Sequence, residues 1–265
     1  MIDFVNILQP QTIIAFFLIF VRVSTILLFA PFFSSQVFYN QIKVFFAIVV
    51  TFVVMPNVPV DMDNIPVNAG IIELLILTFK EMLIGFSLGL IGQIVLGGIQ
   101  LAGQFISIQT GLSFANVVDP TTQLQNPIFS QILTLFAILI FLALDGDIIY
   151  IKALNQSFEV IPLGQVAVNG GVEILIKGVG QLFVIGLQIS SPFIVSLLLL
   201  DVAFAIFAKM MPQANIFFIA MPLKVGAGIV MLWLVVPRLA VAFTQYFNDM
   251  WGTLEKMIAA LSGVI

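Results

Sequence analysis

Long apolar runs separated by short polar breaks limit what this chain can fold into. The runs cover about residues 10–31, 37–55, 70–110, 128–144, 179–208 and 215–236. An apolar helix of about twenty residues is long enough to cross the hydrocarbon core of a bilayer, which is about 30 Å thick. Helices satisfy their own backbone hydrogen bonds there. The sequence therefore predicts an all-α, polytopic membrane-type protein with helical hairpins.

The composition excludes several classes of function. Charged residues make up 8% of the 265 residues, against about 25% in soluble domains. The chain has no His and no Cys, which excludes the usual zinc ligands, disulfides, and thiol or imidazole catalysis. A net charge of −4 from so few groups indicates no nucleic-acid partner. We therefore expect no catalytic residues, no metal and no cofactor.

The chain is expected to form one domain, residues 1–265, in two parts. The N-terminal helical part covers about 1–178 and includes a central loop, 111–127. The C-terminal part, 179–265, is a helical hairpin followed by an amphipathic tail from residue 237, which is expected to lie at the membrane interface. The first apolar run lacks a basic segment before it, so we expect it to be retained rather than cleaved as a signal peptide.

A hairpin with charged residues on both arms is predicted in the C-terminal part. Two apolar arms flank a break that contains a proline, which predicts a turn. The residues that define this hairpin motif are Asp201, Pro212, Gln213, Asn215, Pro222 and Lys224. The two charged residues are equidistant from the turn, so in an antiparallel hairpin they lie at the same height. Because a lone charge is costly in an apolar setting, either they pair with each other or each pairs with a neighbouring subunit.

Small and polar residues recur at steps of three or four in the third run. Gly85 and Gly89 have the spacing of a helix-packing motif, and we expect them to lie against another helix rather than lipid. The polar members of the same stripe are Gln93, Gln100, Gln104 and Ser107. Two interpretations remain open for this stripe, close helix packing or a face toward a water-filled path.

The loop that follows, 111–127, has no Lys or Arg, and its first half is apolar. Its candidate functional residues are Gly111, Leu112, Phe114, Val117, Asp119 and Pro120. Non-helical backbone at membrane depth is tolerated where protein or a cavity surrounds it. The loop either packs onto neighbouring helices or lies in a lumen and closes it.

Three segments resemble the signatures of the FliR family of flagellar protein-export components. They are GLSFANVVDP at 111–120, the segment 131–158 with Asn155-Gln156-Ser157-Phe158 before Ile161-Pro162, and MPQANIFFIAMPLK at 211–224. The resemblance covers nearly the whole chain in the right order. One departure is Asp147, where the family often has His, so no role is assigned there.

The resemblance implies a core subunit of the flagellar type III export gate, in which a FliP-like part is fused to a FliQ-like hairpin. It implies assembly with FliP and FliQ, and with FlhB, in the bacterial inner membrane at the flagellar basal body. Unfolded exported proteins and membrane lipid would be the other partners. The family's central loop contributes to a plug, and Gly111, Phe114, Asp119 and Pro120 match that motif.

Three alternative functions are consistent with parts of this sequence. The first is the equivalent subunit of a virulence injectisome, which shares the fold. The second is a small-solute secondary transporter, which needs coupling carboxylates in its spans; the candidates are Asp201, Glu73 and Glu81. The third is a membrane enzyme, which the missing His and Cys and the absence of clustered carboxylates disfavour.

Overall fold

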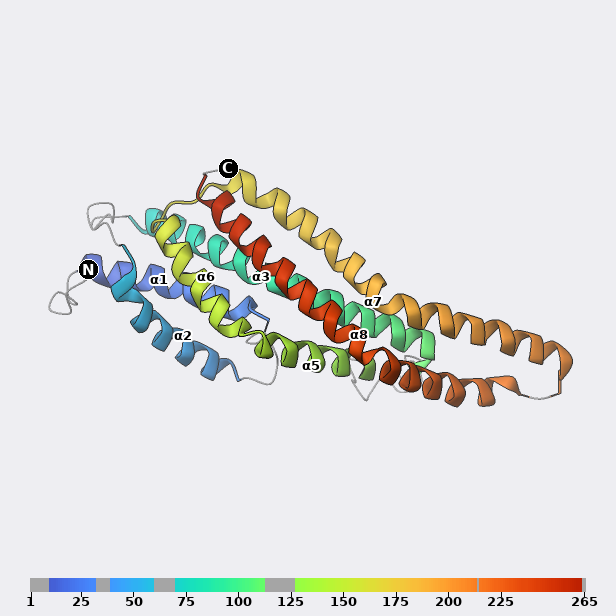
Figure 1. Cartoon of the computed structure of the whole chain (residues 1–265). Helices are drawn as coiled ribbons and strands as arrows, with labels where there is room; N and C mark the ends of the chain where they lie inside the picture. The colour runs from blue at the N-terminus through green and yellow to red at the C-terminus, as the bar shows by residue number, and fades with distance from the viewer. Residues whose placement is uncertain (1–9, 32–38, 60–69, 113–126, 214, 264–265) are drawn as a thin grey trace. The chain divides into compact units, whose positions relative to one another are not determined.

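The structure is a computed structural model of the chain, and it describes all residues except 1–9, 32–38, 60–69, 113–126, 214 and 264–265. Its elements are α1 (Pro10–Phe29), α2 (Asn40–Val54), the 3-10 helix η2 (Met55–Asn57), α3 (Ile71–Thr110), α5 (Ile128–Ala143), α6 (Gly146–Val160), α7 (Val168–Met210) and α8 (Ile216–Leu261) (Figure 1). All regular structure in these described ranges is helical. The all-α prediction is therefore confirmed.

Fewer helices than the six predicted runs are long enough to cross a membrane. Within the described residues, four qualify by length and hydropathy: Pro10–Phe29, Ile71–Thr110, Gly170–Met210 and Phe218–Leu261. A fifth arises if α5 and α6, which meet at a bend of 66°, count as one broken span. The prediction of a span at 37–55 was wrong, because α2 has 15 residues and rises only about 22 Å.

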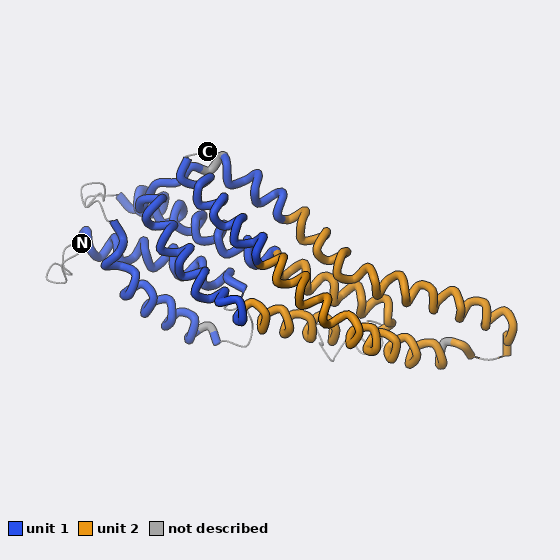
Figure 2. The backbone as a smooth tube through the Cα atoms, in the orientation of Figure 1, with its two compact units in different colours: residues 1–94, 142–178, 248–265 blue, residues 95–141, 179–247 orange. Residues whose placement is uncertain are grey.

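The chain divides into two compact units (Figure 2). Unit 1 comprises residues 1–94, 142–178 and 248–265, and unit 2 comprises 95–141 and 179–247. Helices α3, α7 and α8 therefore contribute residues to both units. The sequence-based division at residue 178 stays a prediction.

Unit 1 has a core of aliphatic side chains from α1 and α3, closed by α6 and the end of α8. Fully or almost fully buried members include Leu18, Ile19, Val23, Ile84, Leu88, Leu154, Phe158 and Met257. The rings of Tyr150 and Trp251 meet edge to face, with their centroids 5.8 Å apart. Such pairs add to the burial of apolar area.

Unit 2 has an aromatic core. Phe136 of α5 packs on Phe243 of α8, with ring centroids 5.8 Å apart, and Phe141 packs on Phe247 at 5.4 Å. The aliphatic residues around them are Ile99, Ile106, Leu133, Ile189 and Leu197. The second half of α3 is thus packed with α5 and with the hairpin arms, α7 and α8.

The turn of the predicted hairpin is confirmed, because α7 ends at Met210 and α8 begins at Ile216. The expectation that a separate tail begins at residue 237 was wrong, since α8 continues through Pro237 and packs Leu254 and Met257 into unit 1. A proline inside a helix leaves the carbonyl four residues earlier without its usual N–H partner. At Pro192 in α7, the hydroxyl of Ser191 donates to that carbonyl, of Gln188, at 2.9 Å. Local side chains of this kind help long apolar helices to continue through a proline.

Candidate functional site

The most buried polar feature of unit 1 is an ion pair between α1 and α3. Arg22 Nε donates to Glu81 Oε2 at 2.5 Å, and both side chains are 0% exposed. A buried charge needs both an opposite charge and hydrogen bonds to its remaining polar atoms. Most of these atoms have partners, and Arg22 Nη2 has none among the described residues. The group formed by Arg22, Glu81, Lys80 and the chain at 157–164 is called the buried polar cluster below.

The guanidinium of Arg22 lies at the C-terminal end of α6. Its Nη1 donates to the carbonyl oxygens of Ser157 and Ile161 at 3.0 and 3.1 Å. Its Cζ lies 4.3 Å from the centroid of the Phe158 ring. A cation at this end of a helix interacts favourably with the helix dipole and with the last carbonyls. These contacts connect Ser157, Phe158 and Ile161, at the end of α6, to α1.

The carboxylate of Glu81 holds the connection between α6 and α7. Gly164 donates its N–H to Glu81 Oε1 at 2.7 Å, and its carbonyl accepts from Lys80 Nζ at 3.0 Å. Gly164 has φ +77°, a conformation that favours glycine. The adjacent side chains of Lys80 and Glu81 therefore bind the carbonyl and the N–H of the same residue, Gly164. Because Glu81 is committed to Arg22 and Gly164, its role here is structural, which disfavours it as a transporter's coupling carboxylate.

Glycines of α3 permit close helix packing in both units. A Cβ on Gly85 would lie 2.8 Å from the carbonyl oxygen of Arg22, and one on Gly89 would lie 2.5 Å from Cβ of Phe29. In unit 2, a Cβ on Gly98 would lie 2.9 Å from Ile185 Cβ in α7. The structure thus places Gly85 and Gly89 against α1 of the same chain. Their importance for assembly stays a prediction.

The predicted polar stripe is divided between the two units. Gln93 belongs to unit 1, and Gln100, Gln104 and Ser107 belong to unit 2. Gln104 is exposed, Gln100 is half-buried, and Ser107 is fully buried. Within the described part of the chain, Ser107 Oγ has no hydrogen-bond partner. A water-filled path along this face stays a hypothesis.

The two charges of the hairpin motif meet in unit 2. Lys224 Nζ and an oxygen of Asp201 form an ion pair between α8 and α7, and Gln109 Nε2 of α3 donates to the other Asp201 oxygen at 3.1 Å. The exposed fractions of the side chains are 18% for Lys224 and 37% for Asp201. Three helices therefore converge on one carboxylate that remains partly open.

The other residues of the hairpin motif and the loop are less informative. Pro212, Gln213 and Asn215 are exposed in the turn, and Pro222 is exposed within α8. Gly111 ends α3 with φ +84°, and Leu112 beside it is half-buried. The candidate plug residues Phe114, Val117, Asp119 and Pro120 lie outside the described residues. Their role stays a prediction.

Arg22 lies inside the first apolar run, 10–31, and the sequence analysis assigned it no partner. A signal was present, because Arg22 and Glu81 are two opposite charges in two apolar runs, and such charges pair. Nothing in the spacing indicated the backbone partners at Ser157, Ile161 and Gly164, since those contacts depend on how α6 ends. The glycines Gly92, Gly98 and Gly103, which also face neighbouring helices, were missed because they lie outside the stripe.

Comparison with known proteins defines the class of protein to which this chain belongs. Residues 13–250 match the family model of bacterial export proteins, family 1. Curated relatives carry the name flagellar biosynthetic protein FliR. The chain is 32% identical to that of Bacillus subtilis (strain 168) over 94% of this chain and 96% of the relative. It is 31% identical to that of Escherichia coli (strain K12) over 91% of each, and 29% identical to that of Aquifex aeolicus over 94% and 96%.

The chain therefore belongs to the bacterial export proteins, family 1, and within it to the FliR family. It is a flagellar biosynthetic protein and a component of the type III export apparatus, as the resemblance of its motifs implied. The relatives carry the flagellar name, which supports the flagellar interpretation over the injectisome alternative.

Proposed function

We propose that this protein forms part of the wall of the flagellar export channel in the bacterial inner membrane, together with FliP, FliQ and FlhB. In this role it acts without catalysis and helps to close the channel to small ions while exported proteins, in unfolded form, pass through it. The family match over almost the whole chain carries the proposal.

The uneven burial of the apolar helices supports an assembled state. In the most apolar 18-residue window of α3, 67% is buried by the chain itself, but the figures are 11% for α7 and 6% for α8. Large side chains such as Phe207, Phe218 and Trp233 are exposed on these two arms. Exposed apolar surface of this extent needs lipid or another subunit to cover it. A hairpin subunit beside FliP and FliQ would have such surfaces.

Co-purification tests the assembly. The chain, tagged and expressed with the rest of the flagellar genes, is expected to purify with two other small membrane proteins, and to accumulate poorly when expressed alone. A stable, monodisperse chain that binds none of the export proteins would contradict the proposal.

The loop 111–120 is proposed to close the conduit, with Phe114 as a principal side chain of the plug. The motivation is the apolar, uncharged character of the loop and its match to the family's central signature. Phe114→Ala is expected to leave assembly intact and to let assembled channels leak small ions, measured as conductance after reconstitution. Ion-tight Phe114→Ala complexes would reject this role. Phe207→Ala, on the exposed face of α7, is the matched control and is expected to stay tight.

A further inference from the structure

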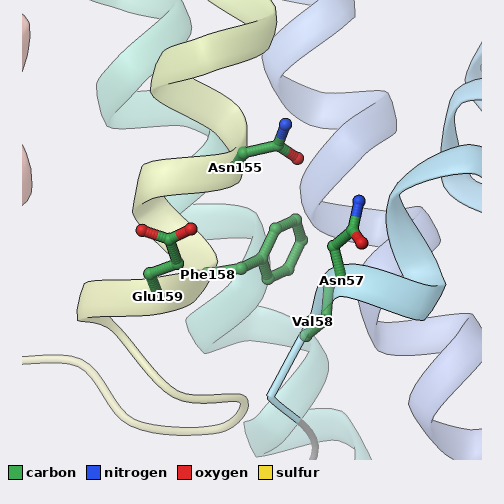
Figure 3. Close-up of a pocket in the computed structure, with 5 residues that line it drawn as sticks. All are labelled: Asn57, Val58, Asn155, Phe158 and Glu159. Atoms are coloured by element: carbon green, nitrogen blue, oxygen red, sulfur yellow. The ribbon is translucent and has the colours of Figure 1, made fainter. Parts of the chain in front are cut away.

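A cavity of about 320 Å³ lies in unit 1 between the ends of α2 and α6 (Figure 3). Its lining comprises Asn57 and Val58 at the end of η2 and Asn155, Phe158 and Glu159 in the last turns of α6. Figure 3 shows the amide of Asn155 above the Phe158 ring and that of Asn57 beside it, with the carboxylate of Glu159 on the side opposite Asn57. The volume falls in the range of about 300–1,000 Å³ that small-molecule sites occupy.

Among the described residues, one buried polar atom of this cavity is left without a partner, and the carboxylate at its rim forms no ion pair. Asn155 Oδ1 is buried and accepts no hydrogen bond from any described residue. Glu159 forms no ion pair within the described part of the chain. A buried acceptor without a donor is costly, and the Glu159 carboxylate in the same lining adds negative charge. This lining fits a ligand group that donates hydrogen bonds and is positively charged.

An apolar surface leads to the cavity along α2. Ile42, Phe45, Val49 and Phe52 recur at steps of three and four, so they share one face of the helix, and all four are exposed. This face extends for about 15 Å. Val53, which is also exposed, precedes Asn57 of the cavity by four residues. The exposed surface of α2 thus changes from apolar to polar where α2 ends.

A polar, anionic cavity at the end of an apolar helix face fits an amphiphile with a cationic head. We propose that this site binds the primary ammonium group of a phosphatidylethanolamine molecule whose acyl chain lies along α2. The ammonium donates to Asn155 Oδ1 and pairs with Glu159. Lys152 lies seven residues before Glu159, near the same face of α6, at a height about 10 Å away, where its charge suits the lipid phosphate.

The headgroup chemistry gives the proposal a sharp contrast. A primary ammonium has three N–H donors, whereas the quaternary ammonium of phosphatidylcholine has the same charge and no donor. Only the first satisfies Asn155 Oδ1. Selection between these two lipids therefore tests the hydrogen bond separately from the charge and from the acyl chain.

The experiment uses the assembled export complex, reconstituted in an equal mixture of phosphatidylethanolamine and phosphatidylcholine with identical acyl chains. After partial removal of lipid, native mass spectrometry counts the molecules of each lipid retained per complex. We expect at least about tenfold more phosphatidylethanolamine than phosphatidylcholine, since the loss of one hydrogen bond to a charged donor has an effect of this order. Glu159→Gln and Asn155→Leu should each reduce the excess toward parity.

Glu173→Gln is the matched control, because Glu173 is an exposed carboxylate of unit 1 that pairs with Lys177 on α7. The Glu173→Gln complex should keep the excess of phosphatidylethanolamine over phosphatidylcholine. Glu159 is itself exposed, so its variant is expected to fold even if Asn155→Leu does not. A photo-crosslinking residue in place of Phe52 should label lipid.

Three results would overturn the proposal. Equal retention of the two lipids by the unchanged complex would mean that the cavity holds only water. An excess that persists in Glu159→Gln would place the selective site elsewhere. Crosslinks from position 52 to another export subunit, rather than to lipid, would mean that a protein covers α2.

Discussion

Arg22–Glu81 in unit 1 and Asp201–Lys224 in unit 2 are both ion pairs on apolar helices, but their surroundings differ. Arg22 and Glu81 are 0% exposed, and further hydrogen bonds from them reach α6 and the connection after it. The pair in the hairpin is partly open, and it has one additional partner, Gln109. The first pair is fully buried within the chain, with Arg22 Nη2 left without a partner among the described residues, whereas the second leaves part of its carboxylate accessible.

The same difference appears in the helices that carry the pairs. The most apolar windows of α1 and α3 are 50% and 67% buried by the chain itself, whereas those of α7 and α8 are 11% and 6% buried. Unit 1 thus has its own core, in which the Arg22–Glu81 pair is fully buried. The hairpin arms depend on lipid or neighbouring subunits for their burial. Substitutions in the two regions should therefore differ in what they disturb, namely folding in unit 1 and assembly in the hairpin.

The largest effect is expected from Glu81→Ala. It leaves the guanidinium of Arg22 buried without its counter-charge and the N–H of Gly164 without its acceptor. Breaking one side of a buried pair costs about 3–5 kcal/mol, a large part of the stability of a typical domain. We expect little or none of the variant protein to accumulate in the membrane. The measurement is its yield in the purified export complex.

A double variant separates charge from packing at this site. Arg22→Met combined with Glu81→Leu removes both charges and keeps apolar volume, a kind of exchange that is often neutral. It should recover much of the lost yield. Lys177→Ala, in the exposed pair with Glu173, is the control and should change the yield little. A mild phenotype for Glu81→Ala would mean that the cluster is not essential for folding.

An intermediate effect is expected from Gly103→Ala in unit 2. A Cβ at this position would meet the backbone of Ser130 in α5, with its nitrogen at 2.5 Å. The obstacle is backbone, so two helices must move apart, at a cost of about 1–3 kcal/mol. Thermal unfolding of the purified complex measures the shift. Gly226→Ala, where a Cβ would meet no atom within 4 Å, is expected to be neutral or slightly stabilising. If both variants lower the unfolding temperature equally, close contact at Gly103 is not the cause.

The sequence predicted some features of the two ion pairs and their helices better than others. Hydrophobic runs and proline positions were sufficient for α1, α3 and α5, for the turn between Met210 and Ile216, and for the height of Asp201 and Lys224, because these depend on local geometry. They did not predict α6, which lies outside the apolar runs, or the full lengths of α7 and α8. Prolines 192 and 237 did not end their helices, since long apolar helices can continue through a proline.

The buried polar cluster could not be predicted in full. Its charged members were visible, but the carbonyls that Arg22 binds belong to residues whose side chains carry no signal for it. Those contacts follow from the packing of α1, α3 and α6, which joins residues more than a hundred positions apart. The same holds for the cavity beside Phe158, which is formed by the ends of two helices far apart in sequence.

The smallest effect within the chain is expected at the hairpin pair. Asp201→Ala leaves Lys224 unpaired, but both side chains are partly exposed, and pairs in such settings contribute about 0–1 kcal/mol. Co-purification with the other export proteins should therefore fall only modestly. The double exchange Asp201→Lys with Lys224→Asp should restore it, because the two residues would still meet at the same height. Gln109 would then face a lysine instead of a carboxylate, so recovery is expected to be incomplete.

The size of the Asp201→Ala effect also reports on the assembly. A loss of complex much larger than about tenfold would exceed what a partly exposed pair can contribute, and would mean that a neighbouring subunit buries the carboxylate in the complex. If the double exchange then fails as well, the partner that matters is a charge on that subunit. The difference between the two pairs would then disappear, because the hairpin pair would be buried in the assembly as the Arg22–Glu81 pair is buried within unit 1.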